Sequence, residues 1–257
     1  MPETVKQAAA GASPAGAADE RQAAQAVRQM FDEIAPRYDL LNHVLSANVD
    51  RLWWWRTARR FDHILKRPDA RVLDLCCGTG DMTLALRKRA PQDAISHIGA
   101  DFAHQMLTRG REKFAGKGVV GVEADALNLP FADERFDLVT SAFGFRNLAN
   151  YRAGLREIHR VLAPGGEMGI LDFSEPGGLL GKVYAFYFRK VLPAIGTLIS
   201  GVRGPYEYLP ASVEKFPAPE KMVEHMREAG FSEVSWTPYT FGIAGLYRGK
   251  KPVASRQ

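Results

Sequence analysis

The chain has 257 residues, enough to bury a full hydrophobic core, and its 46% apolar and 25% charged residues are typical of an ordinary soluble globular protein. Its only cysteines, Cys76 and Cys77, are adjacent, which excludes a disulfide framework and favours a reducing cytoplasm. The six histidines are scattered, so no catalytic metal ion is expected. The net charge of +5 is modest but unevenly distributed along the chain.

The first part of the chain is predicted to lie outside the main domain. Residues 1–20 are rich in alanine and glycine and lack the basic start and apolar run of a signal peptide, so a disordered tail is expected. Residues 21–68 are expected to form a helical lid, with helices over about 20–38 and 52–65 joined by a connecting stretch. The main domain is predicted over 69–250, with an insertion at 179–218, followed by a tail at 251–257.

The main domain shows alternating strand and helix patterns. Strands are expected near residues 71–75, 95–101, 119–123, 136–143, 167–173, 233–238 and 241–248, and helices are clearest at 82–89, 106–114, 151–162 and 220–229. This alternation predicts a parallel sheet covered on both faces. The last two strands are too close together for a crossover helix, so they must pair antiparallel. The expected fold class is α/β, a doubly wound, seven-stranded, mostly parallel and Rossmann-like sheet.

The most informative stretch is residues 72–80, where an apolar strand carrying Asp74 breaks into a turn bounded by Gly78 and Gly80. Two glycines let a nucleotide-like ligand approach the backbone. A dinucleotide loop would have a third glycine where this chain has Thr83, and Asp74 would repel a pyrophosphate but attract an ammonium group. A ligand with an amino group, a ribose and no phosphate fits better, which indicates S-adenosylmethionine. A plain strand–turn–helix junction is the alternative.

Two further acids end successive predicted strands. Asp101 lies 21 residues beyond Gly80, where a carboxylate with two oxygens can accept both hydroxyls of a ribose. Asp125 ends the third strand, which faces the adenine in methyltransferases, so Asp125 could accept the exocyclic amine and Ala126 could offer its backbone N–H. Three acids in order at strand ends predict a class I S-adenosylmethionine-dependent methyltransferase.

The turn after the fourth predicted strand, residues 143–147, should lie at the carboxyl edge of the sheet, where ligands bind in open α/β folds. The aspartate-, asparagine- or serine-Pro-Pro-aromatic turn of many nucleic-acid amine methyltransferases is absent there. Methyltransferases that act on C5 of cytosine or uracil need a nucleophilic cysteine, but both cysteines of this chain belong to the cofactor loop. The turn does offer Arg146 and Asn147, and the expected lid offers Tyr38. Together these side chains could lower the pKa of a phenol and hold the phenolate, whose ring carbon would then attack a methyl group.

Residues 179–203 combine many aliphatic and aromatic side chains with four basic residues and no acid. Such a segment fits contact with an anionic membrane surface or with an apolar substrate. A core-packing helix with a basic face is the alternative. The longest uncharged run, 191–202, is too short to span a bilayer.

The chain resembles the ubiquinone/menaquinone biosynthesis C-methyltransferase family over residues 27–250. The most specific matches are residues 38–46 with Trp53 and residues 160–174, and residues 143–147 and 210–213 also fit. The resemblance implies S-adenosylmethionine-dependent methylation of the ring carbon of a polyprenyl quinol, which could be demethylmenaquinol, a benzoquinol or both. Asp50, where many members have histidine, favours menaquinone. The resemblance also implies cofactor contacts at Thr79, Asp101, Asp125 and Ala126, and a catalytic neighbourhood at Tyr38, Arg146 and Asn147.

The mechanism requires the reduced quinol, because an oxidised quinone ring is itself electrophilic. Arg146 is expected to stabilise the phenolate, since an arginine is not a base at neutral pH, and the base is unassigned. No nucleic-acid partner is expected, but with a pI near 9.2 a methyltransferase for RNA or another small molecule is an alternative, as is a non-catalytic cofactor-binding module. A cytoplasmic protein at the inner face of the cell membrane is expected, and a homodimer is left open.

Overall fold

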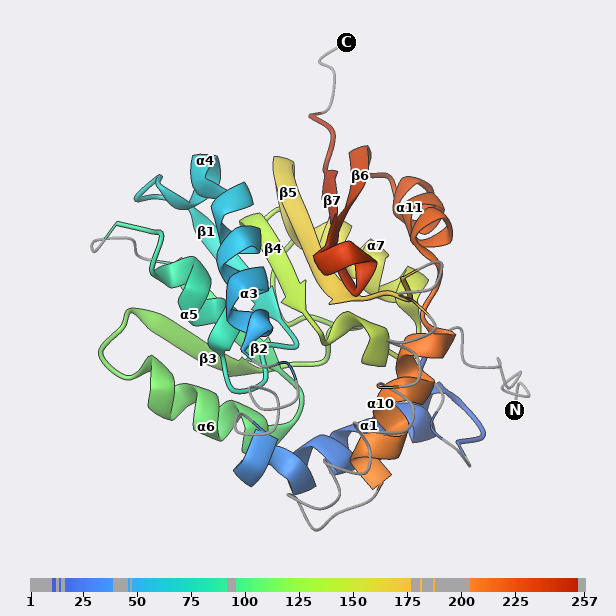
Figure 1. Ribbon diagram of the computed structural model, residues 1–257. Coiled ribbons are helices and arrows are strands. Elements are labelled where there is room, and N and C mark those ends of the chain that lie inside the picture. The colour runs from blue at the N-terminus through green and yellow to red at the C-terminus, as the bar shows by residue number, and fades with distance from the viewer. Residues whose placement is uncertain are drawn as a thin grey trace, which may run out of the picture.

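The structure is a computed structural model, and the residues that it describes are 11–12, 14, 17–38, 46, 48–91, 96–176, 181, 187 and 204–253. Its centre is a seven-stranded sheet in the order β3-β2-β1-β4-β5-β7-β6 (Figure 1). The strands are β1 (Arg71–Leu75), β2 (Ser96–Asp101), β3 (Val119–Glu123), β4 (Phe136–Ala142), β5 (Leu162–Phe173), β6 (Ser232–Tyr239) and β7 (Ala244–Lys250). The first five strands pair in parallel, whereas β7 pairs antiparallel with both β5 and β6. The predicted mostly parallel sheet with a terminal hairpin is therefore confirmed.

Helices cover both faces of the sheet. On one face lie α3 (Val49–Arg60), α4 (Asp62–Leu65), α5 (Asp81–Arg87) and α6 (His104–Phe114), whose buried side chains pack against β1 and its neighbours. On the other face lie α7 (Tyr151–Val161) and α11 (Pro219–Glu228). The short 3-10 helices η2 (Phe145–Asn147) and η4 (Thr240–Gly242) follow β4 and β6.

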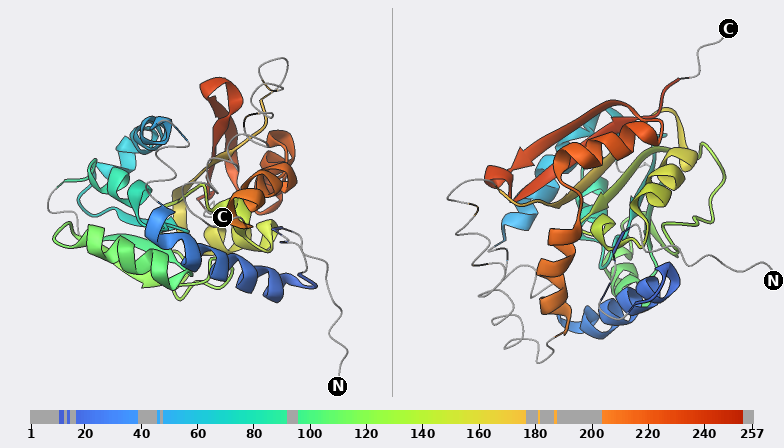
Figure 2. Two further views of the ribbon diagram at one scale, coloured as in Figure 1. Left: turned by 60° about the horizontal axis from the view of Figure 1, so that its bottom comes forward. Right: turned by 90° about the vertical axis from the view of Figure 1, so that its right-hand side faces the viewer.

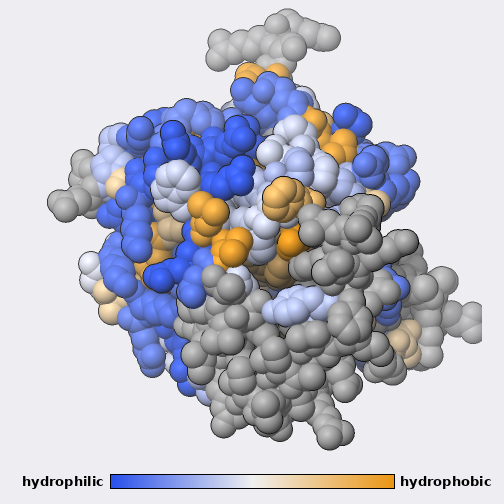
Figure 3. Space-filling view, viewed as in Figure 1, coloured by the Kyte–Doolittle hydropathy of each residue, from blue (hydrophilic) through white to orange (hydrophobic). Residues whose placement is uncertain are grey.

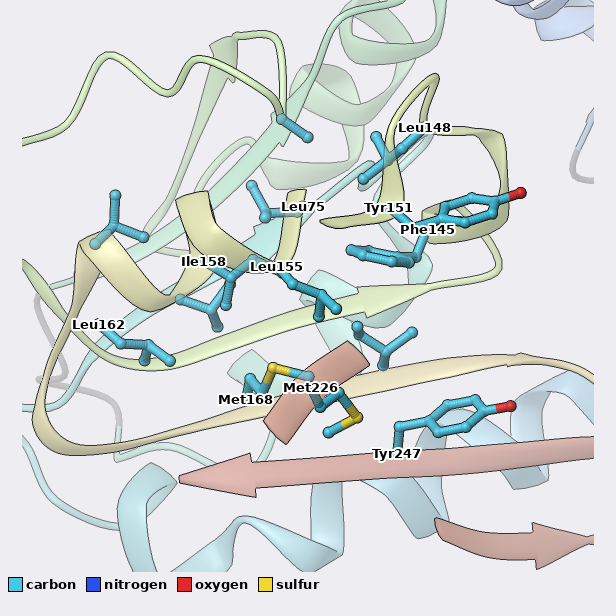
Figure 4. Close-up of a cluster of buried hydrophobic side chains, with 14 of the residues drawn as sticks. Leu75, Phe145, Leu148, Tyr151, Leu155, Ile158, Leu162, Met168, Met226 and Tyr247 are labelled. Carbon is cyan, nitrogen blue, oxygen red and sulfur yellow. The ribbon is translucent and has the colours of Figure 1, made fainter. Parts of the chain in front are cut away.

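The largest hydrophobic core lies between the sheet and the α7–α11 layer. Figure 4 shows Leu155 and Ile158 of α7 above Met168 of β5, with Met226 of α11 and Tyr247 of β7 beside them. The helix α7 begins at Asn150, whose side chain accepts the backbone N–H of Ala153 and so caps the first turn. This core fixes the carboxyl end of β4, from which η2 projects.

The amino-terminal helix α1 (Glu20–Ile34) lies across the carboxyl edge of the sheet, next to α6 and to α10 (Gly204–Lys215) (Figure 2). It begins at Asp19, whose carboxylate accepts the backbone N–H of Gln22, and it ends before the 3-10 turn η1 (Ala35–Arg37), which contains Pro36. Asp32 accepts the backbone N–H of Gln105, which ties α1 to the start of α6.

Part of the expected tail is also described. The backbone N–H of Ala12 donates to the carbonyl of Leu148 at 2.8 Å, and the Ala12 side chain is buried. A Cβ atom on Gly11 would lie 2.2 Å from the same carbonyl oxygen, so the chain passes there in close contact with the segment after η2.

Several boundaries differ from the sequence prediction for local reasons. The predicted helix over 52–65 is two helices, because the backbone at Phe61 leaves the helical region between α3 and α4. Strand β5 begins at Leu162 instead of 167, because residues between Leu162 and Glu167 form an irregularity opposite the start of β4. Gly165, at φ +80°, makes this irregularity possible, and its N–H donates to the carbonyl of Lys251.

Candidate active site

A cavity that is partly open to solvent lies at the carboxyl ends of β1, β2 and β4 beneath α1. Open α/β sheets bind their ligands at this edge. The lining residues come from the strand ends, the loops after them and the amino-terminal helix, and they are Ala24, Phe31, Tyr38, Leu75, Cys76, Gly78, Ala100, Asp101, Phe102, Met106, Ala124, Asp125, Ala126, Leu127, Ala142, Phe143, Gly144, Asn147, Leu148 and Ala149. Tyr38, Gly78, Asp101, Asp125, Ala126 and Asn147 of the predicted site residues are therefore brought together.

The glycine turn has the open backbone that the sequence predicted. Gly78 has φ +55°, and nothing lies closer to a Cβ built there than a ring carbon of Tyr38 at 4.0 Å. Position 80, where φ is +89°, needs glycine for a second reason. A Cβ there would lie 2.2 Å from the ring of Phe114. Gly78 thus leaves room on the cavity side of the turn, whereas Gly80 lets α6 pack against the other side.

Asp101 is held firmly at the cavity wall. Its Oδ2 accepts the backbone N–H of Gly78 at 2.7 Å, and its Oδ1 accepts that of Ala103 at 2.8 Å. Burial raises the pKa of Asp101 to about 6, and the two backbone donors only partly offset this effect. Each carboxylate oxygen has two lone pairs, so the fixed side chain can still accept two hydrogen bonds from a diol in the cavity.

The loop after β3 provides a second polar part of the wall. The Oδ1 of Asp125 accepts the backbone N–H of Leu127 at 2.9 Å, which closes a tight turn around Ala126. Asp125 is exposed, Ala126 is buried, and both line the cavity. This turn can therefore present a carboxylate and a backbone edge to a planar ring.

Asp74 has a different position from the one expected. It is fully buried, and its two oxygens accept the hydroxyls of Thr83 at 2.6 Å and Thr140 at 2.7 Å. Burial raises its pKa to about 6, with a smaller contribution from nearby Asp101. Asp74 does not line the cavity; it joins β1 to the start of α5 and to β4 underneath the glycine turn.

Thr79 and Gly80 are also absent from the cavity wall. The hydroxyl of Thr79 accepts a hydrogen bond from the ammonium of Lys113 at 3.1 Å, and the Thr79 side chain is 2% exposed. Lys113 also pairs with Asp81 at 3.1 Å, so these side chains fasten the glycine turn to α6. Thr79 faces α6, and its side chain is turned away from the cavity.

Arg146 is buried behind the wall, in a network that joins three elements. Its guanidinium pairs with Asp172 of β5 at 2.8 Å and also bonds the carbonyl of Phe143 and, at 3.3 Å, the hydroxyl of Ser212 on α10. The other oxygen of Asp172 accepts the backbone N–H of Arg146 at 3.1 Å. With its donors directed to these acceptors and only 5% exposure, Arg146 holds η2 in place and does not reach the cavity.

The next residue, Asn147, does line the cavity. Its side-chain oxygen Oδ1 is buried and has no hydrogen-bond partner within the part of the chain that the structure describes. A buried acceptor without a donor is costly, so such a group at a cavity wall is suited to a ligand donor. Tyr38 lies opposite the open side of Gly78. Its ring packs against that of Phe31 of α1 in a T-shaped arrangement with 6.1 Å between the ring centroids.

Three residues where the ends of β1 and β4 meet were not among the predicted site residues, although the turn 143–147 was expected at this edge of the sheet. Cys76 and Phe143 have positive φ angles of 51° and 57°, which are uncommon for residues with bulky side chains, and Gly144 fits between them. A Cβ on Gly144 would lie 2.3 Å from that of Cys76. Cys77 packs against Leu107 and Phe114 of α6, whereas Cys76 lines the cavity. In the sequence, only the pair Phe143-Gly144 could have indicated this contact.

Two parts of the prediction lie outside the described residues. These are the stretch 39–45 that continues from Tyr38 and nearly all of the basic and aromatic segment 179–203.

The chain matches the ubiE/COQ5 methyltransferase family over residues 18–251. Among curated proteins it is 49% identical to the demethylmenaquinone methyltransferase of Deinococcus radiodurans, covering 91% of this chain and 95% of that one. It is 51% identical to the enzyme of the same name from Thermus thermophilus, covering 87% and 100%. It is 43% identical to the ubiquinone/menaquinone biosynthesis C-methyltransferase of Geotalea daltonii, covering 88% and 96%.

Solved structures give the same fold at low identity. A SAM-dependent methyltransferase from Thermotoga maritima has a TM-score of 0.60 at 20% identity, covering 88% of this chain and 99% of that one. The cyclase SpnF has a TM-score of 0.65 at 18% identity, covering 95% and 99%. One fold therefore serves a methyl transfer and a cyclisation, so the chemistry has to be argued from the site.

Proposed function

This chain belongs to the ubiE/COQ5 methyltransferase family, and from that premise we propose that it methylates a ring carbon of demethylmenaquinol, a quinol with a polyprenyl tail, to give menaquinol. The family makes it an S-adenosylmethionine-dependent methyltransferase. The substrate follows from the two relatives named demethylmenaquinone methyltransferase. The observation that carries the proposal is that one cavity is lined both by a fixed carboxylate, that of Asp101, and by the amide oxygen of Asn147, which has no partner among the described residues.

The cavity wall fits S-adenosylmethionine in its residue types. Asp101 would accept the two ribose hydroxyls, Gly78 would let the ligand approach the backbone, and the turn of Asp125 and Ala126 would contact the adenine. When bound, the cofactor supplies an electrophilic methyl group on a sulfonium sulfur. Asp74, Thr79 and Gly80 would support this site from behind, because their side chains or packing fix the glycine turn.

The quinol would lie between Asn147 and Tyr38. The free oxygen of Asn147 can accept the hydrogen bond of a phenolic hydroxyl and so orient the ring, which is the main contribution that a protein makes to such a transfer. Arg146 would act as a positioning residue, because its ion pair with Asp172 fixes η2 and hence the direction of Asn147. A direct contact of Arg146 with the phenolate would require that buried ion pair to open.

The benzoquinol step of ubiquinone biosynthesis is a second candidate function, because the relative from Geotalea daltonii is named for both quinones. Asp50, which favoured menaquinone, is 4% exposed at the start of α3 and is absent from the cavity wall. It therefore offers no substrate contact that would separate the two quinols.

The test is single-turnover methylation with saturating S-adenosylmethionine and short-chain substrates that dithionite keeps reduced. We expect transfer to demethylmenaquinol, less to a benzoquinol, and none when either substrate is oxidised. Asn147→Ala should lower the rate by on the order of 100-fold, the scale for one misplaced catalytic hydrogen bond, and leave cofactor affinity within threefold. Transfer to neither quinol would refute the proposal, and faster transfer to the benzoquinol would favour the second candidate.

A substrate with a polyprenyl tail resides in a membrane, so we extend the proposal to peripheral contact with an anionic bilayer. None of the helices in the described ranges is long and apolar enough to cross a membrane. The segment 179–203, expected to make this contact, lies mostly outside those ranges, so the contact surface has to be sought elsewhere.

A further inference from the structure

The outward side of α3 carries an unbalanced positive charge. Arg51, Arg56, Arg59 and Arg60 form no ion pair with any described carboxylate, whereas Arg71 and Arg89 close by do. The only acid of this helix, Asp50, is buried. The guanidinium of Arg59 lies 5.3 Å from the ring of Trp55, so aromatic and basic groups are interleaved.

Large apolar side chains are exposed on the same side of the molecule. Leu52 and Trp55 of α3 are 50% and 47% exposed, and Phe241 of η4 is 83% exposed. Figure 3 shows orange apolar residues beside a blue hydrophilic area on the face that carries α3 and η4. The indole N–H of Trp53 donates to the hydroxyl of Thr240 at 2.8 Å, which fixes η4 against α3. These groups therefore form one surface.

Phe241 is held in water at the tip of η4 in an unfavourable backbone conformation, with φ +57°. This conformation is uncommon for an aromatic residue, and a ring that is mostly exposed gains little packing energy. A partner that covers the ring would explain why the chain keeps it there.

The arginines also surround a shallow surface hollow, lined by Trp55, Arg56, Arg59, Arg60 and Arg248. Arg248 pairs with Glu167 at 2.9 Å, and Arg56 lies over the ring of Tyr239 at 4.3 Å, so this hollow has fixed walls. A hollow of this charge suits the phosphate of a lipid headgroup.

The surface adjoins the cavity through a run of aromatic rings. Trp53 packs against Phe143 with 5.7 Å between ring centroids, and Phe143 packs against Phe173 at 4.6 Å. Phe143 lines the cavity. A continuous cluster of packed aromatic rings therefore lies between α3 and the place where the quinol ring would react.

We propose that α3 and η4 form the surface by which the enzyme rests on an anionic lipid bilayer, which we name the α3–η4 face: Arg51, Leu52, Trp55, Arg56, Arg59, Arg60 and Phe241. The arginines bind anionic headgroups, while Leu52, Trp55 and Phe241 enter the boundary between headgroups and acyl chains. The inference rests on the proposed function, because a tailed quinol gives the bilayer as the occupant of this face. Charge complementarity and exposed aromatic rings at one surface carry it.

The test is co-sedimentation of the full chain with vesicles of phosphatidylcholine containing a third of phosphatidylglycerol. Arg56→Gln/Arg59→Gln/Arg60→Gln should weaken binding by on the order of 100-fold, and Phe241→Ser by roughly tenfold. Binding of the wild type should also weaken as salt rises and be far lower on pure phosphatidylcholine.

The matched control removes three other exposed arginines, Arg135→Gln/Arg156→Gln/Arg227→Gln, from the α7–α11 side of the sheet. It should bind vesicles nearly as the wild type does. Equal losses in both triple variants would mean that only net charge matters, and would overturn the proposal. So would a wild type that ignores anionic vesicles or that instead binds a single-stranded oligouridylate through the same arginines.

Methylation of a soluble short-chain quinol separates this inference from the proposed function. The α3–η4 variants should retain that activity and lose turnover only with a long-tailed quinol embedded in anionic vesicles. Failure to methylate any quinol, together with arginine-dependent vesicle binding, would refute the proposed reaction and leave the docking surface standing. Normal methylation without vesicle binding would support the proposed reaction and refute the docking surface.

Discussion

Two buried carboxylates at the ends of neighbouring parallel strands, Asp74 and Asp101, have opposite relations to the cavity. Burial raises the pKa of each to about 6. Asp101 accepts two backbone N–H groups and faces the cavity, whereas both oxygens of Asp74 are occupied by threonine hydroxyls behind it. The same residue type near the ends of two neighbouring strands therefore lines the cavity in one case and supports the glycine turn from behind in the other.

Position along the strand explains the difference: Asp74 pairs with Gly99 of β2, so Asp101 lies on the same face of the sheet but two residues nearer its carboxyl edge. Asp74 shares a face of β1 with Val72, which packs towards α3 and α5, while the neighbouring Leu75 lines the cavity. Asp101 is the last residue of β2, where the backbone of the glycine turn itself folds over the carboxylate. An acid near a strand end can therefore be assigned as a ligand candidate only when its distance from the carboxyl edge of the sheet is known.

The largest effect should come from Asp74→Ala. This change leaves the buried hydroxyls of Thr83 and Thr140 without an acceptor, so the free energy of unfolding should fall by about 3 kcal/mol. Urea denaturation measures it. Asp74→Asn keeps an acceptor and should lose much less. In the folded fraction, S-adenosylmethionine affinity should stay within threefold of the wild-type value. A larger drop would indicate that Asp74 contacts the cofactor.

Asp101→Asn should show the opposite pattern. Replacing one carboxylate oxygen by an amide removes a charged acceptor for the ribose, which should weaken S-adenosylmethionine binding by about 2 kcal/mol, or roughly 30-fold. Titration calorimetry on the folded variant measures this. The retained oxygen can still accept a backbone N–H, so stability should change less than in Asp74→Ala. Unchanged affinity would exclude Asp101 from the cofactor site.

A smaller loss is expected when one hydroxyl behind the turn is removed. Thr140→Val deletes a donor to Asp74 at nearly constant volume and should lower the free energy of unfolding by about 1.5 kcal/mol. Thr57→Val is the control, since the Thr57 hydroxyl is equally buried and has no partner among the described residues. That variant should be neutral or slightly stabilised. Equal losses in both would show that volume and shape outweigh the bond to Asp74.

The smallest effect is a dependence on pH that has opposite signs for binding and folding. With a pKa of about 6, Asp101 is mostly protonated at pH 5.5, so S-adenosylmethionine affinity should fall about fourfold between pH 7.5 and 5.5. Asp101→Asn should be flat over this range. Calorimetry at several pH values checks both proteins.

Folding without cofactor should respond in the other direction. The pKa of Asp74 in the folded protein lies above the ordinary value of 3.8, so the folded state binds more protons between these values. Stability relative to Asp74→Asn should therefore rise as pH falls through 6. His97 opposes this trend, because burial lowers its pKa to about 4, and the comparison with Asp74→Asn cancels its contribution. A constant difference would contradict the raised pKa of Asp74.

The sequence predicted the sheet well because its signals are local. Apolar runs, glycines at turns and the short gap before β7 do not depend on the rest of the molecule. The sequence could not predict that Arg146 pairs with Asp172, since these residues meet only when β4 and β5 lie side by side. It could likewise not separate Asn147, which faces the cavity, from its neighbour Arg146, which faces the interior.

The position of β7 has a consequence for how the chain is made. β7 (Ala244–Lys250) comes last among the strands, yet it lies inside the sheet between β5 and β6. When the ribosome has completed β6, the strand that separates β5 from β6 has not yet been made. β5 therefore keeps a free apolar edge until residues 244–250 emerge. Such edges can pair with other nascent chains. A stop codon before residue 244 would leave β6 without a partner strand and the outer edge of β5 unpaired.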